Sequence, residues 1–354
     1  MKKLAWLLTL MSATALAGTG DVLHLYNWSG SLSQKILDDF QRQCACRVVQ
    51  DFYGDNEEML AKLASGARGY DMVFPSSFVI QAMARQHLLL PLDHGKLPNL
   101  RNVAPAYLNQ SYDPGNTYTV PTVLSLTSVG YNVEVLKKRG VDAGSWAVIF
   151  DPAVLAKIKG KVTVLDSSRE VFAAALMYLG IDPNTRNLAD YDKAAAVIRK
   201  ARPYWATFSN ASYLKELAVG NIWVSLGYST EFFQAQEDAR AAKRKFSIGN
   251  VPQREGNELG VDTMAILKSA RRPDLALQFM NFMLEGRNAA QLTNLNGATN
   301  PVSTAAAFFR PDLKANPVIN PAPATVRQWT VLRELEPKER RYLTRLWTRV
   351  KVGS

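Results

Sequence analysis

Short β-rich runs alternate with helical patterns along most of this 354-residue chain. The pattern predicts strands at 22–27 and 47–53 and helices at 33–43 and 57–63, followed by a buried strand at 71–75 and a helix that continues to Met83. Ile36, Leu37 and Phe40 recur at helical spacing. Alternation of this kind is typical of βαβ units on a parallel sheet. The sequence therefore predicts an α/β fold.

A second α/β block follows a long β-rich stretch at 117–131, which Pro121 and Gly130 interrupt. Beyond it we expect strands at 162–166, 221–228, 246–251 and 261–267, with a Gly-containing loop between the last two, and helices at 168–179, 231–244, 274–284 and 338–350. The proline-rich segment 301–323 predicts an ordered surface loop. Two α/β blocks joined by extended passages favour two lobes around a hinge, although a two-domain enzyme has the same pattern.

The N-terminus has the pattern of a cleavable signal peptide. Met1-Lys2-Lys3 precedes an apolar run at 4–16, and Ala15-Leu16-Ala17 supplies a small-x-small cleavage site. The run is shorter than the roughly 20 residues of a membrane-spanning helix. We therefore expect residues 1–17 to be removed and the mature protein, from Gly18, to be soluble and exported.

The composition is that of a globular protein with a basic surface. The formal net charge of +11 becomes 11 − 2 = +9 without Lys2 and Lys3. The basic residues are scattered among 31 acidic ones, and they form no basic patch interleaved with aromatic residues. The charge pattern thus favours a solvated basic surface over a nucleic-acid site.

The cysteines and histidines show no catalytic or metal-binding pattern. A disulfide between Cys44 and Cys46 would close a very small ring, so we expect two unbonded apolar residues at a helix-to-strand junction, with intermolecular pairing as the alternative. His24, His87 and His94 lack metal-ligand spacing, and we expect no metal or cofactor. The phosphate-binding loop, the nucleophile elbow and His-Glu-x-x-His are absent from the sequence. These absences argue against an enzyme, and they leave a secreted carboxylate-dependent hydrolase as one alternative.

Seven short motifs, in order along the chain, carry a resemblance to a known family. They are Leu25-Tyr-Asn-Trp-Ser29, Asp71-Met-Val-Phe-Pro-Ser76, Val129-Gly-Tyr-Asn132, Leu165-Asp-Ser-Ser-Arg-Glu-Val-Phe172, Gly227-Tyr-Ser-Thr-Glu231, Val261-Asp-Thr-Met-Ala265 and Trp347-Thr-Arg-Val-Lys351. The set resembles the periplasmic polyamine-binding proteins of ABC importers, particularly the putrescine-binding branch.

The resemblance implies a two-lobed, flytrap-like fold of the type II-like class, with a hinge between the lobes. Lobe 1 is expected at 18–130 plus 258–300, and lobe 2 at 131–257 plus 301–354. It also implies a monomeric, non-enzymatic receptor that captures a polyamine, such as putrescine or spermidine, and delivers it to a membrane permease, with no nucleic-acid partner. A sensor of the same fold that signals to a membrane protein is the further alternative.

The resemblance also assigns ligand-binding residues. Trp28 matches an aromatic residue that lines the cleft, and Ser29 matches its polar neighbour. Ser76 and Ser77 match a loop that faces the cleft, while Glu170 and Asp262 match carboxylates that bind ammonium groups. Tyr228 stands where the family usually has tryptophan, and Glu231 where the putrescine branch has aspartate.

The chemistry of these residues suits an alkyl diamine, because each buried ammonium needs a carboxylate and the methylenes pack against aromatic faces. The chain departs from the family pattern at Gly30, Ser31, Phe78 and Gly260. These departures predict a roomier cleft for a longer or bulkier amine, or a ligand of another class.

Overall fold

The computed structural model describes residues 21–352. The expected signal peptide at 1–17 therefore lies outside the described residues. The strands are β1 (Val22–Trp28), β2 (Arg47–Tyr53), β3 (Met72–Val73), β4 (Thr119–Asn132), β5 (Val162–Val164), β6 (Thr207–Phe208), β7 (Val224–Tyr228), β8 (Ile248–Val251), β9 (Asn257–Ile266) and β10 (Trp329–Thr330).

The helices alternate with these strands along most of the chain. They are α1 (Gln34–Cys44), α2 (Asn56–Ala64), α3 (Ser77–Arg85), α4 (Val133–Arg139), α5 (Ala147–Phe150), α6 (Pro152–Leu155), α7 (Ser168–Tyr178), α8 (Leu188–Ala201), α9 (Tyr213–Val219), α10 (Ser229–Ala241), α11 (Pro273–Met283), α12 (Gly286–Asn296), α13 (Pro311–Lys314), α14 (Pro323–Val326) and α15 (Pro337–Val352).

The strands within residues 21–352 pair in the order β2-β1-β3-β9-β4-β7-β5-β6, with β10 beside β9 and β8 beside β4. The outer pairs β1/β2, β1/β3, β5/β7 and β5/β6 are parallel, as βαβ units require. The long strands β4 and β9 run antiparallel to each other in the middle of this order. The expected α/β fold is confirmed.

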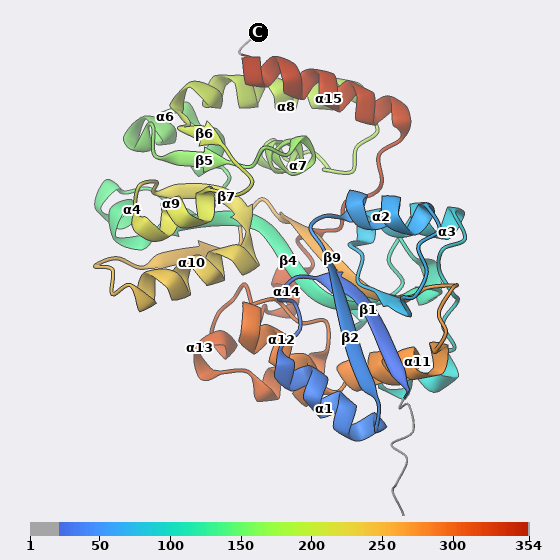
Figure 1. Cartoon of the computed structure of the whole chain (residues 1–354). Coiled ribbons are helices and arrows are strands. Elements are labelled where there is room, and N and C mark those ends of the chain that lie inside the picture. The colour runs from blue at the N-terminus through green and yellow to red at the C-terminus, as the bar shows by residue number, and fades with distance from the viewer. Residues whose placement is uncertain (1–20, 353–354) are drawn as a thin grey trace, which may run out of the picture.

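Buried side chains within residues 21–352 form two clusters, one in each lobe. The first extends along β4 as far as Leu126, and the second begins at Val129 on the same strand. The chain returns between Ile248 of the second cluster and Leu259 of the first. Figure 1 shows β4 and β9 passing between the lobe that holds α1 and α11 and the lobe that holds α7, α8 and α15.

The sequence-based lobe bounds place the third passage between the lobes near Pro301. In the structure this passage comes later in the chain. Buried residues from Val302 to Trp329 pack in the first cluster, and Leu343 to Val350 pack in the second. The segment 301–323 is therefore not a simple surface loop. It contains α13, and its apolar side chains at Leu313, Val318 and Ile319 are buried because they close the first core.

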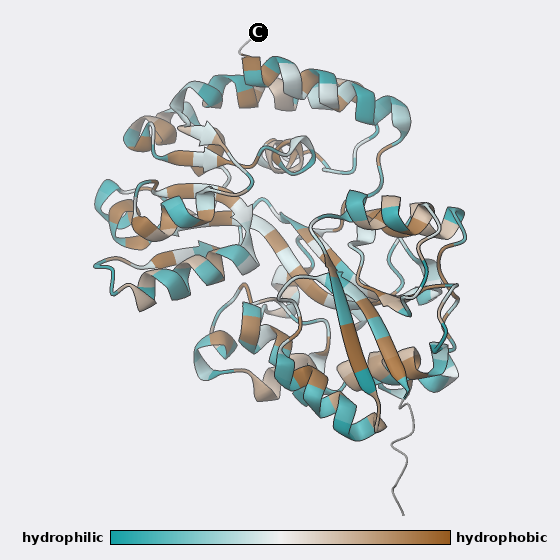
Figure 2. Cartoon of the chain, in the orientation of Figure 1, coloured by the Kyte–Doolittle hydropathy of each residue, from teal (hydrophilic) through white to brown (hydrophobic). Residues whose placement is uncertain are grey.

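Helix α1 illustrates how sequence pattern produces packing. The Ser33 hydroxyl accepts a hydrogen bond from the Ile36 amide and caps the N-terminus. Ile36, Leu37 and Phe40 form the buried face, and the Phe40 ring packs edge-on to Phe279 of α11 with centroids 4.9 Å apart. Figure 2 shows hydrophobic and hydrophilic segments alternating along such helices, as one-sided burial requires.

Strand β4 continues through both expected interruptions. Pro121 is accommodated by a shift in register between Pro121 and Val123. At Gly130, a Cβ atom would lie 2.1 Å from the Phe232 ring, so α10 packs directly on the strand backbone at this point. Glycine here permits close packing and does not end the strand.

The prediction for the two cysteines was wrong, because Cys44 and Cys46 form a disulfide. The intervening Ala45 has φ of 51° and ψ of 37°, so the chain turns at the end of α1 and does not run on extended. The turn places the two Cα atoms 5.1 Å apart, within the range that a disulfide spans.

Candidate functional site

The two strands that cross between the lobes present one partly accessible face. Along β9, Glu258, Gly260 and Asp262 are partly accessible and alternate with buried neighbours. Their partners on β4 are, in the same order, Thr127, Ser125 and Val123. We call these six residues the crossing-strand face. The face joins the lobes and carries two carboxyl groups.

Asp262 marks the end of this face that belongs to the first lobe. Its Oδ1 accepts a hydrogen bond of 2.6 Å from the Ser76 hydroxyl, and the two residues also form a backbone bridge. Asn56 at the start of α2 donates to the same Ser76 oxygen at 3.2 Å and accepts from the Ser76 amide at 3.1 Å. Ser76 is thus fixed by α2 and aims its proton at Asp262.

Aromatic side chains lie next to this end of the face. The Trp28 indole donates to the Phe74 carbonyl at 2.8 Å, and the Tyr53 hydroxyl donates to the same oxygen at 2.6 Å. The Trp28 and Tyr53 rings lie 4.5 Å apart at 63°. Burial is the main cause that raises the pKa of Tyr53, and the charge of Asp262 raises it further. Trp28, Tyr53 and Asp262 therefore belong to one neighbourhood.

A second carboxyl neighbourhood lies at the other end of the face. The Tyr228 hydroxyl, at the end of β7, donates to Oε1 of Glu170 at 3.2 Å. Ser167, which precedes α7, donates to the other Glu170 oxygen. Glu258 accepts a bond of 3.0 Å from Thr127. The charge of Glu170 raises the pKa of Glu258, and the charge of Glu258 raises the pKa of Tyr228. Elements of the second lobe thus bring Glu170 toward β9.

The carboxyl groups of this site are partly buried in the part of the chain that the structure describes. Within residues 21–352, Glu170, Glu231, Glu258 and Asp262 take part in none of the ion pairs. Burial raises the pKa of Asp262 to about 6 and that of Glu231 to about 7. Burial also raises the pKa of Glu258, the charge of Glu170 raises it further, and Arg169 opposes both. Such groups favour an incoming cation.

The remaining predicted residues are less closely connected. Glu231 lies in the first turn of α10, and its buried Oε2 has no hydrogen-bond partner among the described residues. Ser29 is exposed in the turn after β1. Ser77 is buried at the start of α3 and has no hydrogen bond to the other predicted residues within 21–352. The structure therefore brings together Trp28, Ser76 and Asp262, and separately Glu170 and Tyr228.

Sequence reasoning missed Tyr53 and Glu258. Glu258 fell in a segment interpreted as a loop, because Gly256 and Gly260 flank it. The period-two alternation of Glu258, Gly260 and Asp262 was the available signal. Tyr53 ends β2, where a buried aromatic residue resembles ordinary core. Its position beside Trp28 depends on the pairing of β1 with β2, in which these two residues are partners.

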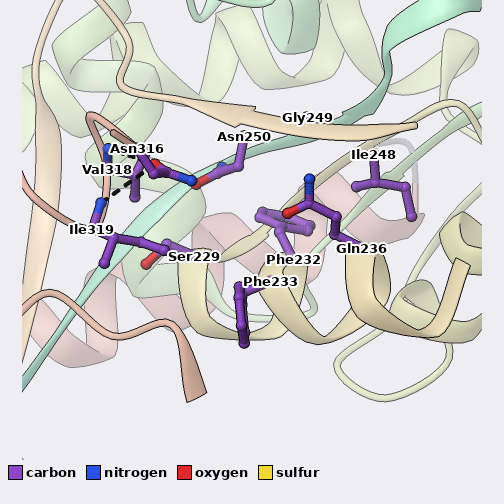
Figure 3. Close-up of a pocket in the computed structure, with 10 residues that line it drawn as sticks. All are labelled: Ser229, Phe232, Phe233, Gln236, Ile248, Gly249, Asn250, Asn316, Val318 and Ile319. Carbon is purple, nitrogen blue, oxygen red and sulfur yellow. Dashed lines mark hydrogen bonds between the residues drawn. The ribbon is translucent and has the colours of Figure 1, made fainter. Parts of the chain in front are cut away.

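Two cavities lie away from the crossing-strand face. One of about 140 Å³ lies between α10, β8 and the segment 316–319, and the residues that line it include Phe232, Phe233 and Asn316 (Figure 3). Another of about 300 Å³ lies in the first lobe beside His87 and Lys268. Neither lining includes a carboxyl group. The described residues contain no cluster suited to a metal ion, and none of their helices is long and apolar enough to cross a membrane.

Comparison with known proteins identifies the family. The family model for bacterial extracellular solute-binding proteins matches residues 35–321. The chain belongs to this family. A putrescine/cadaverine-binding protein of Pseudomonas aeruginosa is 45% identical to this solute-binding protein over 352 residues, which cover 99% of each chain. The putrescine-binding periplasmic protein PotF of Escherichia coli is 33% identical over 351 residues, with 97% of this chain and 95% of PotF covered.

Solved structures agree with the two-lobed fold. The spermidine/putrescine substrate-binding protein PotD of Streptococcus pneumoniae matches this solute-binding protein with a TM-score of 0.87. The match covers 94% of this chain and 99% of PotD at 24% sequence identity. The resemblance described for the seven sequence motifs is thus confirmed at the level of the family, and the expected flytrap-like architecture is confirmed at the level of the fold.

Proposed function

We propose that this protein captures an alkyl diamine or a related polyamine between its lobes in the periplasm and delivers it to the membrane permease of an ABC importer. The observation that carries the proposal is the set of carboxyl groups at the crossing-strand face. Glu170, Glu258 and Asp262 lie at the junction of the lobes beside aromatic rings, and they form no ion pair within residues 21–352. A ligand with a cation at each end supplies the missing charges.

The lobes give the site a means of closure. Asp262 is tied to the first lobe through Ser76, whereas Glu170 is carried by α7 of the second. A diamine that contacts both carboxylates binds the closed arrangement better than an open one, and it shifts the population by that difference in affinity. The closed shape is then the form that a permease recognises.

The similar proteins support transport over the other functions. The relatives are named as putrescine- and cadaverine-binding proteins, and one named structure is a substrate-binding protein of an ABC transporter. They favour neither the sensor nor the hydrolase alternative. We therefore assign the protein a receptor role without catalysis, with the periplasm as its compartment after removal of residues 1–17.

A thermal-shift screen tests this function. The mature protein from Gly18 is melted with putrescine, cadaverine, spermidine, spermine, agmatine and a set of amino acids. A ligand at 100 times its dissociation constant adds about 2.7 kcal/mol to the unfolding free energy. We expect a raised melting temperature with diamines and unchanged melting with neutral amino acids. A folded protein that no amine stabilises would refute the proposal.

A further inference from the structure

Glu258 is the carboxyl group of the crossing-strand face that the family resemblance does not assign. Its side chain leaves β9 on the same face as that of Asp262, because the strand pairs with β4 without a bulge from Glu258 to Asp262. The two acids therefore stand at opposite ends of a single stretch of strand. The backbone of β9 sets the spacing of their Cα atoms.

The strand fixes this separation at a value that suits a short diamine. A strand rises about 3.3 Å per residue, so the two Cα atoms lie about 13 Å apart. If each ammonium group lies about 2.8 Å from its carboxylate, on the line toward the other acid, the two ammonium groups are about 7 to 8 Å apart. An extended carbon chain advances about 1.25 Å per bond, so the nitrogens of a five-carbon diamine are about 7.5 Å apart. Those of a four-carbon diamine are about 6.3 Å apart.

The residue between the two acids on this face of β9 has no side chain. Gly260 lies midway, and a Cβ atom there would meet the Ser125 carbonyl oxygen at 3.4 Å, with no other heavy atom of the described residues within 4 Å apart from its chain neighbours. Any larger side chain at this position would stand between Glu258 and Asp262. The glycine therefore leaves Glu258 accessible along the strand.

The groups around Glu258 leave it able to accept a cation. Thr127 donates to Oε2, and Glu170 and Tyr228 face the same carboxyl group. The nearby cation is Arg169, whose guanidinium donates to the backbone carbonyls of Pro183 and Arg333. Arg169 also donates to Oδ1 of Asn184, and it takes part in none of the ion pairs within residues 21–352.

We infer that Asp262 binds one ammonium of a diamine and that Glu258 and Glu170 together bind the other. The spacing of Glu258 and Asp262 on β9 then selects a five-carbon chain. This inference rests on the proposed function and adds to it the residue that sets chain length. It makes Glu258 a specificity-determining residue.

The test is a calorimetric titration with unbranched diamines of three to six carbons. The wild-type protein should bind the five-carbon diamine best. Glu258→Gln should lose about ten-fold or more in affinity for that diamine and discriminate less between chain lengths. Glu258→Asp withdraws the carboxylate by one methylene toward the strand backbone, so this variant should also bind the five-carbon diamine more weakly than the wild type.

Glu237→Gln is the control, because it removes a glutamate charge from α10 outside the crossing-strand face. Glu237 is partly exposed and pairs with Arg240 and Arg310, and such pairs contribute little. This variant should retain the wild-type profile. Melting curves without ligand establish that each variant is folded, and Glu258→Asp decides the result where Glu258→Gln does not fold. Wild-type affinities and chain preference in both Glu258 variants, or a wild-type optimum at another length, would overturn the inference. A wild-type protein that binds no diamine would instead refute the proposed function.

Discussion

The phenol of Tyr228 donates a hydrogen bond of 3.2 Å to the carboxylate of Glu170 across 58 residues of sequence. The bond joins the end of β7 to the first turn of α7, and Ser167 donates to the other Glu170 oxygen. Both Glu170 oxygens therefore have a donor before any ligand arrives. The pair fixes the direction in which this carboxylate faces the crossing strands.

Tyr228→Phe should weaken diamine binding by about 0.5–1.5 kcal/mol, because the ring remains while Glu170 loses one oriented donor. Calorimetry measures the change in dissociation constant. Tyr342→Phe is the matched control, since it removes a comparable surface bond from Tyr342 of α15 to the Asp192 carboxylate of α8. Equal effects of the two variants would show that Glu170 needs no orientation by Tyr228.

Ser76→Ala should weaken binding more at pH 6 than at pH 8. The Ser76 hydroxyl opposes the burial that raises the pKa of Asp262 to about 6. Without this donor the pKa rises further, so that a larger fraction of Asp262 is protonated at pH 6 and cannot pair with an ammonium. Dissociation constants at the two pH values check this, with the exposed Ser303→Ala as control. An equal loss at both pH values would contradict it.

Diamine binding to the wild-type protein should release protons and weaken as the pH falls from 8 to 5.5. Glu231 has a pKa raised to about 7 and Asp262 a pKa raised to about 6, so both are partly protonated in this range. An alkylammonium, with a pKa near that of lysine at about 10, stays charged. It lowers the pKa of the carboxyl groups that it contacts.

Titrations in buffers of different ionisation enthalpy measure the released protons. A binding enthalpy that does not depend on the buffer, with constant affinity between pH 5.5 and 8, would refute the coupling. In the ligand-free protein the same groups affect folding stability, and this effect has the opposite pH dependence to that of ligand affinity. Their pKa values are raised in the folded state, so their contribution to stability is present at low pH and is lost as the pH rises through about 6 to 7.

Gly130→Ala should destabilise the protein by about 1–3 kcal/mol, because the added methyl group would overlap the Phe232 ring. Gly260→Ala is a matched control on the partner strand, where the nearest atom is 3.4 Å away, and it should change stability little. Denaturant unfolding of the ligand-free variants measures both effects. Similar unfolding free energies would contradict the packing of α10 on β4.

The fold was largely predictable because its signals are local. The alternating strands and helices and the face of α1 formed by Ile36, Leu37 and Phe40 follow from periodicity. What the sequence did not reveal depends on contacts between distant segments. Pro121 and Gly130 read as breaks, yet pairing with β9 and packing against α10 keep β4 continuous. Cys44 and Cys46 pair because Ala45 adopts a left-handed conformation that local propensity disfavours.

The residues of the candidate site also divide into those that the sequence indicates and those that depend on contacts between distant segments. Trp28, Glu170 and Asp262 were predicted from residue type and family resemblance, and they stay predictions. Glu258 was missed because Gly256 and Gly260 made its segment read as a loop, and it became a strand residue through pairing with Thr127, 131 positions earlier. Tyr53 was missed because its proximity to Trp28 arises from the register of β1 and β2.

The most direct test of diamine capture by carboxylates is a calorimetric titration of the mature protein with cadaverine, alongside Glu170→Gln, Asp262→Asn and the control Glu237→Gln. We predict one binding site in the wild type and the control, and a loss of about 1–3 kcal/mol or more in each of the other two variants, since each loses a charge-assisted contact. Unchanged affinity in Glu170→Gln and Asp262→Asn would contradict binding at the crossing-strand face.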